Sequence, residues 1–268
     1  MFKGLLDGKS AIVTGAGRGI GRDIAIAMAE AGCNVALVSR TQGQLEETCG
    51  QISSIESSPM CITVPCDITK EGVSKDIVNE VLSSLGGIDI LINCAGTFVM
   101  KPFIPGMKNN MSAVPGFDIP LSNKEWYRQM DTNVTGAFNL TREAVSGYMA
   151  EYGGKIVFIS SIDAVKGMAY HAAYAASKGA ITSLTKSLAA ELGRFDINVN
   201  CICPGFVHTD MTDFAHSDKK IRTVMENMSP LRRVTRTHDV AWLAVFLSSV
   251  AADCITGQVI CADCGVTC

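Results

Sequence analysis

The chain has 268 residues, of which 47% are hydrophobic and 18% are charged. Lysine and arginine nearly balance aspartate and glutamate, which leaves a formal net charge of −3. No basic cluster extends beyond a pair such as Arg232-Arg233, so the composition argues against a nucleic-acid partner and against an anionic membrane surface.

Targeting and metal-binding signals are also missing. Residues 1–7 include an acid and no apolar core of signal-peptide length, so we expect a cytoplasmic protein. The longest apolar stretch, 240–250, is about half as long as a membrane span requires. Without a secretory signal the eleven cysteines are expected to remain thiols. The spacing Cys261-x-x-Cys264-x-x-x-Cys268 has no accompanying histidine or second pair, and so we expect no bound metal.

Short apolar runs rich in β-branched residues alternate with segments of helical pattern along the chain. Repeated βαβ units require a parallel sheet with helices on both faces. The sequence therefore predicts an α/β, doubly wound Rossmann fold, with a seven-stranded parallel sheet in a single domain over residues 1–268. The predicted strands are 10–14, 34–39, 60–65, 88–93, 155–160, 198–203 and 258–262. The predicted helices are 19–31, 42–55, 70–85, 124–149, 173–192 and 237–247.

The first predicted strand is followed by a glycine turn, Gly15-x-x-x-Gly19-x-Gly21, that leads into a helix. Glycines permit a sharp turn and close packing, and the free amides of the helix N-terminus attract a pyrophosphate. Ile20 occupies the position of the last glycine in the strict Gly-x-Gly-x-x-Gly spacing. The turn alone therefore does not identify a dinucleotide site.

Two segments interrupt the alternation, and each follows the carboxyl end of a strand, where ligands bind in open parallel sheets. Residues 101–121 contain four prolines and are predicted as an insertion loop. Residues 206–230 have few helix or strand signals and are predicted as a mobile, substrate-binding lid. Surface decoration or a subunit contact is the alternative for both. Apolar residues in and beside these segments predict a pocket for a bulky hydrophobic ligand: Met100, Phe103, Met107, Met111, Phe206, Met211, Phe214 and Met225.

Tyr174 and Lys178 lie in an alanine-rich run, 172–180, that is predicted to be helical, so their side chains stand one turn apart on one face. A cation nearby stabilises the phenolate and lowers its pKa by roughly 1–3 units, which lets Tyr174 exchange a proton with a substrate oxygen. Ser161 lies thirteen residues upstream. Ser160 competes for the same role, but strand alternation directs it to the opposite face.

In their order along the chain, these motifs resemble those of the short-chain dehydrogenase/reductase family of the Tyr-x-x-x-Lys type, in particular its carbonyl reductases. The resemblance covers essentially the whole chain. Asn93-Cys94-Ala95-Gly96 is similar to the family's Asn-Asn-Ala-Gly motif, with cysteine in place of the second asparagine. Asn133 matches its helix-borne active-site asparagine, and Pro204-Gly205 matches its Pro-Gly turn.

The resemblance implies a catalytic group of Asn133, Ser161, Tyr174 and Lys178. Tyr174 would donate a proton to a carbonyl oxygen held by Ser161. Lys178 would bind the nicotinamide ribose and lower the pKa of Tyr174, while Asn133 would anchor a water that links Lys178 to solvent. His171 is either a substrate contact or a solvated loop residue. The residues expected at the coenzyme are Gly15, Arg18, Gly19, Ile20, Gly21, Ser39, Arg40, Asp67, Ile68, Asn93, Ala95, Gly96, Tyr174, Lys178, Pro204, Gly205, Val207 and Thr209.

The end of the second predicted strand, Ser39-Arg40-Thr41, bears on the choice of coenzyme. NAD sites usually place an acid there, which accepts hydrogen bonds from the ribose 2′-hydroxyl. Here no carboxylate would repel a 2′-phosphate, and Arg40 with Arg18 offers a charge-assisted fork for it. We therefore expect NADP(H), with NAD(H) as the alternative if Arg40 only faces solvent.

NADPH-dependent, reversible reduction of a ketone or aldehyde is the leading expectation. An NAD-dependent dehydrogenase of an alcohol, polyol, sugar or steroid is the nearest alternative. A 3-oxoacyl carrier-protein reductase is another, although residues 150–152 lack the basic side chains that suit an acidic carrier. The intact catalytic group argues against a dinucleotide-binding regulator. By the same resemblance we expect a homotetramer or homodimer that associates through 124–149 and 173–192, with 265–268 in a second interface.

Overall fold

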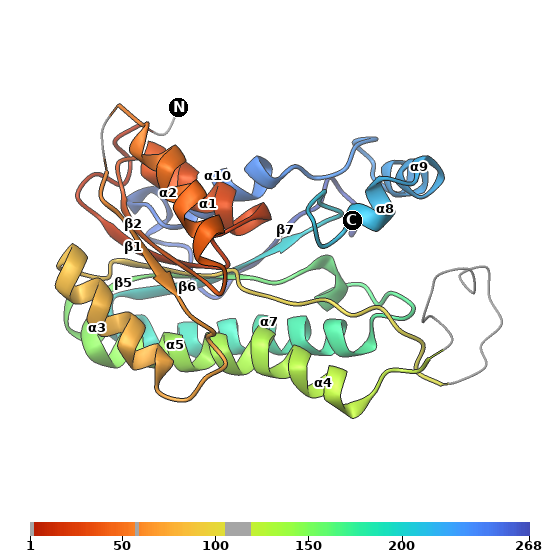
Figure 1. Ribbon diagram of the computed structural model, residues 1–268, viewed down its shortest axis with the longest axis horizontal. Helices are drawn as coiled ribbons and strands as arrows, with labels where there is room; N and C mark the ends of the chain where they lie inside the picture. Colours follow the sequence, from red (N-terminus) through yellow and green to blue (C-terminus); the bar gives the residue numbers. More distant parts are fainter. Residues whose placement is uncertain (1–2, 57–58, 105–118) are drawn as a thin grey trace.

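The computed structural model describes residues 3–56, 59–104 and 119–268, and it contains a seven-stranded sheet in which every strand pair is parallel (Figure 1). The strands are β1 (Ser10–Thr14), β2 (Asn34–Ser39), β3 (Cys61–Pro65), β4 (Ile90–Asn93), β5 (Gly154–Ile159), β6 (Ile197–Pro204) and β7 (Val259–Ala262). Their order is β3-β2-β1-β4-β5-β6-β7, so the chain starts in the middle of the sheet and builds first one edge and then the other. This order confirms the predicted doubly wound fold.

Helices cover both faces of the sheet (Figure 1). One face carries α1 (Gly19–Glu30), α2 (Gln42–Ser53) and α10 (Thr237–Leu247). The other carries α3 (Val73–Leu85), α5 (Gly136–Ala144) and α7 (Ala172–Leu192). Strand side chains alternate between two cores, because Ala11 and Val13 pack with α1 and α10 while Ile12 packs on the opposite side. Burial on both faces explains why the strands appear in the sequence as continuous apolar runs.

The helix predicted over 124–149 belongs to a longer helical run with two wider, π-helical turns. The run comprises α4 (Asn123–Met130), a π-helical turn (Asp131–Thr135), α5, a second such turn (Val145–Met149) and α6 (Ala150–Tyr152). The first π-helical turn carries Asn133, whose side chain is buried. Turns of this kind often occur at functional sites. Across the part of the chain that the structure describes, no helix combines the length and apolar character needed to cross a bilayer.

The segment 206–230 is more regular than its sequence suggested. It contains α8 (Asp213–His216) and α9 (Lys219–Met228), so the expectation of few regular elements there is wrong. The missed signal is Asp218, whose carboxylate accepts from the backbone N–H groups of Lys220 and Ile221 and caps α9. Met225, predicted to line the ligand pocket, is instead the buried residue of this helix and does not line the cavity described below.

The two ends of the insertion 101–121 lie next to each other. The backbone N–H of Leu121 donates to the carbonyl of Pro102 at 2.9 Å, and Lys101 forms an ion pair with Glu125 at 2.8 Å. Residues 105–118, including the predicted pocket residues Met107 and Met111, lie outside the described residues. Phe103 is described and is 77% exposed beside the base of the insertion.

Candidate active site

The glycine turn between β1 and α1 lies directly against the end of β4. Gly15 has a left-handed φ of 70°, and a Cβ there would lie 3.0 Å from the Cα of Ala95. A Cβ on Gly21 would overlap the carbonyl oxygen of Gly15. The hydroxyl of Thr14 accepts from the N–H groups of Cys94 and Ala95, both at 3.0 Å, and so joins the two strand ends. Only glycine fits at these two positions, and the turn leaves the N-terminus of α1 open to a ligand.

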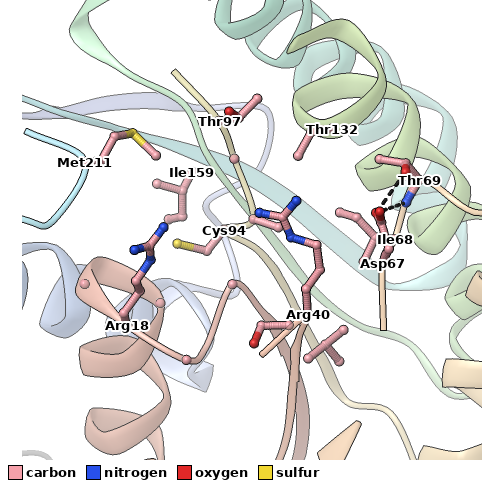
Figure 2. Close-up of a pocket in the computed structure, with 18 of the residues that line it drawn as sticks. Arg18, Arg40, Asp67, Ile68, Thr69, Cys94, Thr97, Thr132, Ile159 and Met211 are labelled. Carbon is pink, nitrogen blue, oxygen red and sulfur yellow. Dashed lines mark hydrogen bonds between the residues drawn. The ribbon is translucent and has the colours of Figure 1, made fainter. Parts of the chain in front are cut away.

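Above this turn lies a cavity of about 740 Å³ at the carboxyl ends of the strands (Figure 2). Its volume is within the range of cofactor sites. The buried Ser39 Oγ at its wall has no hydrogen-bond partner among the described residues, as expected of a group that a ligand satisfies. The predicted coenzyme residues that line the cavity are Gly15, Arg18, Gly19, Ile20, Gly21, Ser39, Arg40, Asp67, Ile68, Ala95, Gly96, Tyr174, Lys178 and Thr209.

The other predicted coenzyme residues do not line this cavity: Asn93, Pro204, Gly205 and Val207. The amide of Asn93 donates to Thr141 Oγ1 at 3.0 Å inside the core. Val207 is buried, and its carbonyl accepts from Thr212 Oγ1 at 2.6 Å. A Cβ on Gly205 would lie 2.7 Å from the Cα of Asp263. In this structure these four residues pack behind the residues that line the cavity.

Two arginines reach the cavity from different elements (Figure 2). Arg40 follows β2 and is exposed. Burial alone would raise the pKa of Asp67, but hydrogen bonds from Thr69 and the charge of Arg40 hold it below its usual value. Arg18, in the glycine turn, pairs with Asp210 at 3.2 Å and so links the turn to the segment after β6. The end of β2 carries no acid, whereas Asp67 at the end of β3 is the carboxylate next to Arg40.

Sequence reasoning missed part of the cavity wall. Neighbouring residues along α2 and α4 reach the cavity because of how these helices pack, and no local pattern marks them. The additional lining residues are Gly17, Val38, Thr41, Gln44, Cys66, Thr69, Cys94, Thr97, Lys124, Tyr127, Arg128, Asp131, Thr132, Ile159, Ser160 and Asp210. Met211, which was predicted to line a pocket for a hydrophobic ligand, also lines this cavity.

The two serines after β5 have separate roles in the structure. The hydroxyl of Ser160 donates to the carbonyl of Lys178 at 2.9 Å in the interior. Ser161 caps a single 3-10 turn, Ile162–Ala164, and its Oγ accepts from the backbone N–H of Asp163 at 3.1 Å. Ser161 also hydrogen-bonds the phenol of Tyr174. Ser160 lines the cavity and Ser161 does not, so the choice of Ser161 over Ser160 stays a prediction, supported by the interaction of Ser161 with Tyr174.

Tyr174 and Lys178 lie on consecutive turns of α7 and both face the cavity. Lys178 is buried, and its ammonium donates to the carbonyl of Ile159 at 2.8 Å. Its Nζ lies 5.7 Å from the centroid of the Tyr174 ring. A Cβ on Gly96 would lie 3.5 Å from the same Nζ, an ordinary van der Waals distance, so the ammonium lies directly beside the end of β4.

The expected effect of Lys178 on the tyrosine is not what the structure shows. Burial, and next the negative charge of Asp163, raise the pKa of Tyr174 above its ordinary value, while the hydrogen bond from Ser161 opposes them. Burial also lowers the pKa of Lys178. The physical reason is that both side chains are enclosed, and the ammonium is directed to the carbonyl of Ile159 rather than to the phenol.

Asn133 joins the helical run to the strand end and to α7. Its Oδ1 accepts from the N–H of Thr97 at 2.8 Å, and its Nδ2 donates to the carbonyl of Thr97 and to Ser177 Oγ, both at 3.0 Å. Both amide hydrogens are thus used within the protein. A water at the predicted place would have to be bound by the remaining lone pair of Oδ1 or by the backbone.

Possible metal ligands do not gather in the described ranges: no group of three or more His, Cys, Asp or Glu side chains there could hold an ion. All eleven cysteines are free thiols. Cys261 and Cys264, which share the one suggestive spacing, lie at the end of β7 and just beyond it.

Comparison with known proteins agrees with this geometry. Residues 15–267 match the family model described as enoyl-(acyl carrier protein) reductase. The 3-oxoacyl-[acyl-carrier-protein] reductase FabG of Staphylococcus epidermidis is 33% identical over 253 residues, which cover 94% of this chain and 96% of the relative.

Two solved structures are similar over nearly their whole length. A putative short-chain alcohol dehydrogenase from Sinorhizobium meliloti is 34% identical with a TM-score of 0.87, covering 99% of this chain and 98% of its own. A 7α-hydroxysteroid dehydrogenase, complexed with NADH and 7-oxo glycochenodeoxycholic acid, is 32% identical with a TM-score of 0.87, covering 98% and 96%.

Proposed function

Because the chain belongs to the short-chain dehydrogenase/reductase family of oxidoreductases, we propose that it reduces a ketone or aldehyde to an alcohol, reversibly, with NADPH as the preferred coenzyme. The observation that carries this proposal is that Tyr174 and Lys178 line a cavity of about 740 Å³ and that Ser161 lies next to Tyr174. A nicotinamide coenzyme, when bound, would supply a hydride, that is one proton with two electrons, to the carbonyl carbon.

The side chains of this chain supply the proton and the orientation. When substrate is bound, the single hydrogen of the Ser161 hydroxyl would turn from the Tyr174 phenol to the substrate carbonyl oxygen, while its Oγ keeps the hydrogen bond from the N–H of Asp163. The Tyr174 phenol transfers its proton to the same oxygen and is then reprotonated from solvent. Lys178, whose ammonium here donates to the carbonyl of Ile159, would hold the ribose hydroxyls of the coenzyme. Asn133 fixes the neighbouring backbone at Thr97.

Preference for NADPH is supported by Arg40, which reaches the cavity from the acid-free end of β2. A guanidinium suits a 2′-phosphate as a charge-assisted, two-pronged donor. NADH stays the alternative, because Arg18 is paired with Asp210 in this structure and Asp67 lies near Arg40.

The proposal that the substrate is hydrophobic is supported by apolar side chains near Tyr174 and in the cavity wall. Met211 lines the cavity and is 39% exposed, and the ring of Phe98 packs edge-on against Tyr174 at 4.9 Å. We propose that residues 206–230 close over such a substrate. The side chain of Phe214 and residues 105–118 lie outside what the structure describes.

A second candidate, reduction of a 3-oxoacyl group on a carrier protein, is favoured by one observation. Lys124 and Arg128 on α4 line the cavity, where they would face an acidic carrier. The similarity to the Staphylococcus enzyme supports the same reading. Comparing acetoacetyl carrier protein with ethyl acetoacetate separates the two candidates, because only carrier recognition makes the first substrate strongly preferred.

Self-association is part of the proposal. The segment expected to form the contact, 124–149, exposes Trp126, Tyr127 and Phe138, of which Tyr127 also lines the cavity. A dimer or tetramer would cover Trp126 and Phe138. Light scattering that shows only monomer at micromolar concentration would contradict this.

Turnover of a carbonyl panel with both coenzymes tests the proposed function. The panel contains an aromatic ketone, ethyl acetoacetate and a small sugar, each with NADPH and with NADH. Tyr174→Phe should lower kcat by roughly 10²–10⁴-fold, because it removes only the transferable proton, and should leave coenzyme affinity unchanged. Parent-like turnover by the Phe variant would exclude Tyr174 as the acid.

A further inference from the structure

The loop 208–216, which follows β6, begins and ends at a histidine. The rings of His208 and His216 stack, with their centroids 4.7 Å apart and their planes at 22°. Between the two histidines, Thr209, Asp210 and Met211 line the cavity. The stacked pair His208 and His216 is therefore the neck of a loop whose tip, residues 209–211, forms part of the cavity wall.

The tip of this loop contacts the glycine turn at two points. A Cβ on Gly19 would lie 3.3 Å from Cγ2 of Thr209, so the backbone of the turn lies close to this side chain. Arg18 pairs with Asp210 at 3.2 Å. The position of the loop thus decides how far the cavity is closed beside the glycine turn, and opening the neck would separate both contacts.

The two rings of the neck have different surroundings. His208 has a side-chain exposure of 59%, and its Nε2 lies 3.0 Å from Oδ1 of Asp213. His216 is 6% exposed, and its Nε2 has no hydrogen-bond partner among the described residues. The imidazole of His216 instead hydrogen-bonds the carbonyl of Val207. A neutral imidazole needs only one donor site, whereas a protonated one donates from both nitrogens, so a proton on Nε2 of His216 would be a buried donor without an acceptor.

Charged groups of the loop and of both short helices act on His216 as well. Burial is the main cause that lowers its pKa, and the positive charges of His208 and of Arg222 on α9 act in the same direction. The hydrogen bond to Val207 and the charge of Asp213 on α8 oppose them. The closed loop therefore holds His216 neutral. Its stability is complete above the ordinary histidine pKa of about 6.5 and decreases as the pH falls below that value.

We propose that His208 and His216 form a pH-sensitive neck, which opens the loop 208–216 on acidification and withdraws Thr209, Asp210 and Met211 from the cavity. His216 is the sensor, because it is buried and one of its nitrogens has no acceptor. His208 keeps Asp213 as a partner in either protonation state. The proposal goes beyond the proposed function, since it concerns the shape of the free protein and involves no chemical step.

Amide hydrogen exchange tests the proposal without substrate or coenzyme. The amides to follow are those of Thr212, His216 and Ser217, which donate to the carbonyls of Thr209, Thr212 and Asp213. After correction for the intrinsic effect of pH, their exchange should be roughly tenfold faster at about pH 5.5 than at about pH 7.5, because opening takes up one proton. His216→Phe keeps a ring against His208 but cannot be protonated, so its exchange should not depend on pH. His238→Phe is the matched control, because His238 lies exposed on α10 and its loss should leave the parent response.

Equal pH responses in the parent and in His216→Phe would overturn the proposal, as would a parent without any response. If the loop of His216→Phe is open at every pH, His216→Asn repeats the test, because it also carries no titrating group and keeps a donor for the carbonyl of Val207.

The dissociation constant of NADH, measured by fluorescence titration over the same pH range, tests the link to the cavity. NADH is used because the 2′-phosphate of NADPH titrates in this range itself. The constant should rise about as much as the exchange rate in the parent and stay level in His216→Phe. A level constant in the parent would contradict withdrawal of the loop tip from the cavity. Turnover at neutral pH, which tests the proposed function, does not enter either measurement, so the two failures are distinguishable.

Discussion

The glycine turn after β1 and the segment 206–230 after β6 both border the cavity, yet different contacts hold them. The turn is fixed by backbone packing, since a Cβ on Gly21 has no room beside the carbonyl of Gly15. The segment reaches the turn through the ion pair of Arg18 and Asp210, whose side chains are 55% and 64% exposed. Exposed pairs contribute only about 0–1 kcal/mol, so the glycine turn is rigidly built, whereas the segment 206–230 is only weakly tethered to it.

Gly21→Ala should break the rigid end and have the largest effect. The added methyl group overlaps the Gly15 carbonyl, which forces the turn away from the end of β4. We expect loss of measurable coenzyme binding by fluorescence titration and a free energy of unfolding lower by roughly 1–3 kcal/mol. Gly43→Ala is the matched control, because its Cβ would meet nothing within 4 Å and should stabilise α2 slightly. Normal coenzyme affinity in Gly21→Ala would show that the turn is not the binding floor.

Arg40→Ala tests whether the coenzyme end also selects the coenzyme. A charge-assisted hydrogen bond contributes about 1.5–3 kcal/mol, so KM for NADPH should rise roughly 10–100-fold while KM for NADH stays within a few-fold. NADH in the same variant serves as the control. Equal losses for both coenzymes would place Arg40 outside the 2′-phosphate site.

Asp210→Asn loosens only the tethered end and should have the smallest effect. We expect the free energy of unfolding to change by less than about 1 kcal/mol. Proteolysis within 206–230 should become faster, because the segment loses a contact with the glycine turn. Arg18→Ala should act alike, and the double variant should add little beyond either single one. Additive effects of the two substitutions would show that the pair does not act as a unit.

The features that the sequence could predict are those that local residue types determine, as in the glycine turn. The seven strands are detectable because both faces of the sheet are covered, which makes each strand a continuous apolar run. The glycine turn is detectable because sterics demand glycine at Gly15 and Gly21. The group of Ser161, Tyr174 and Lys178 was expected from a family resemblance, and the structure places all three together.

Most of the misses depend on contacts between distant segments. Helix α9 is an exception, because Asp218 caps it and its apolar residues Ile221, Val224, Met225 and Met228 recur at helical spacing, so local sequence signals could have predicted it. The direction of the Tyr174 pKa depends on burial and on Asp163, and neither can be read from helical spacing. Lys124 and Arg128 reach the cavity only because α4 packs against α7.

The π-helical turn at Asp131–Thr135 has a consequence for how this chain tolerates length changes. Such a turn holds one residue more than an α-helical turn of the same rise. Deleting one residue there would leave a regular helix whose flanks keep their register, but the side chains that now project from the widened turn would point in other directions. The bonds of Asn133 to Thr97 and Ser177 would then be lost although every neighbouring sequence motif stayed intact. In an alignment of relatives, a single gap in this helix would therefore mark a chain with a rebuilt active site.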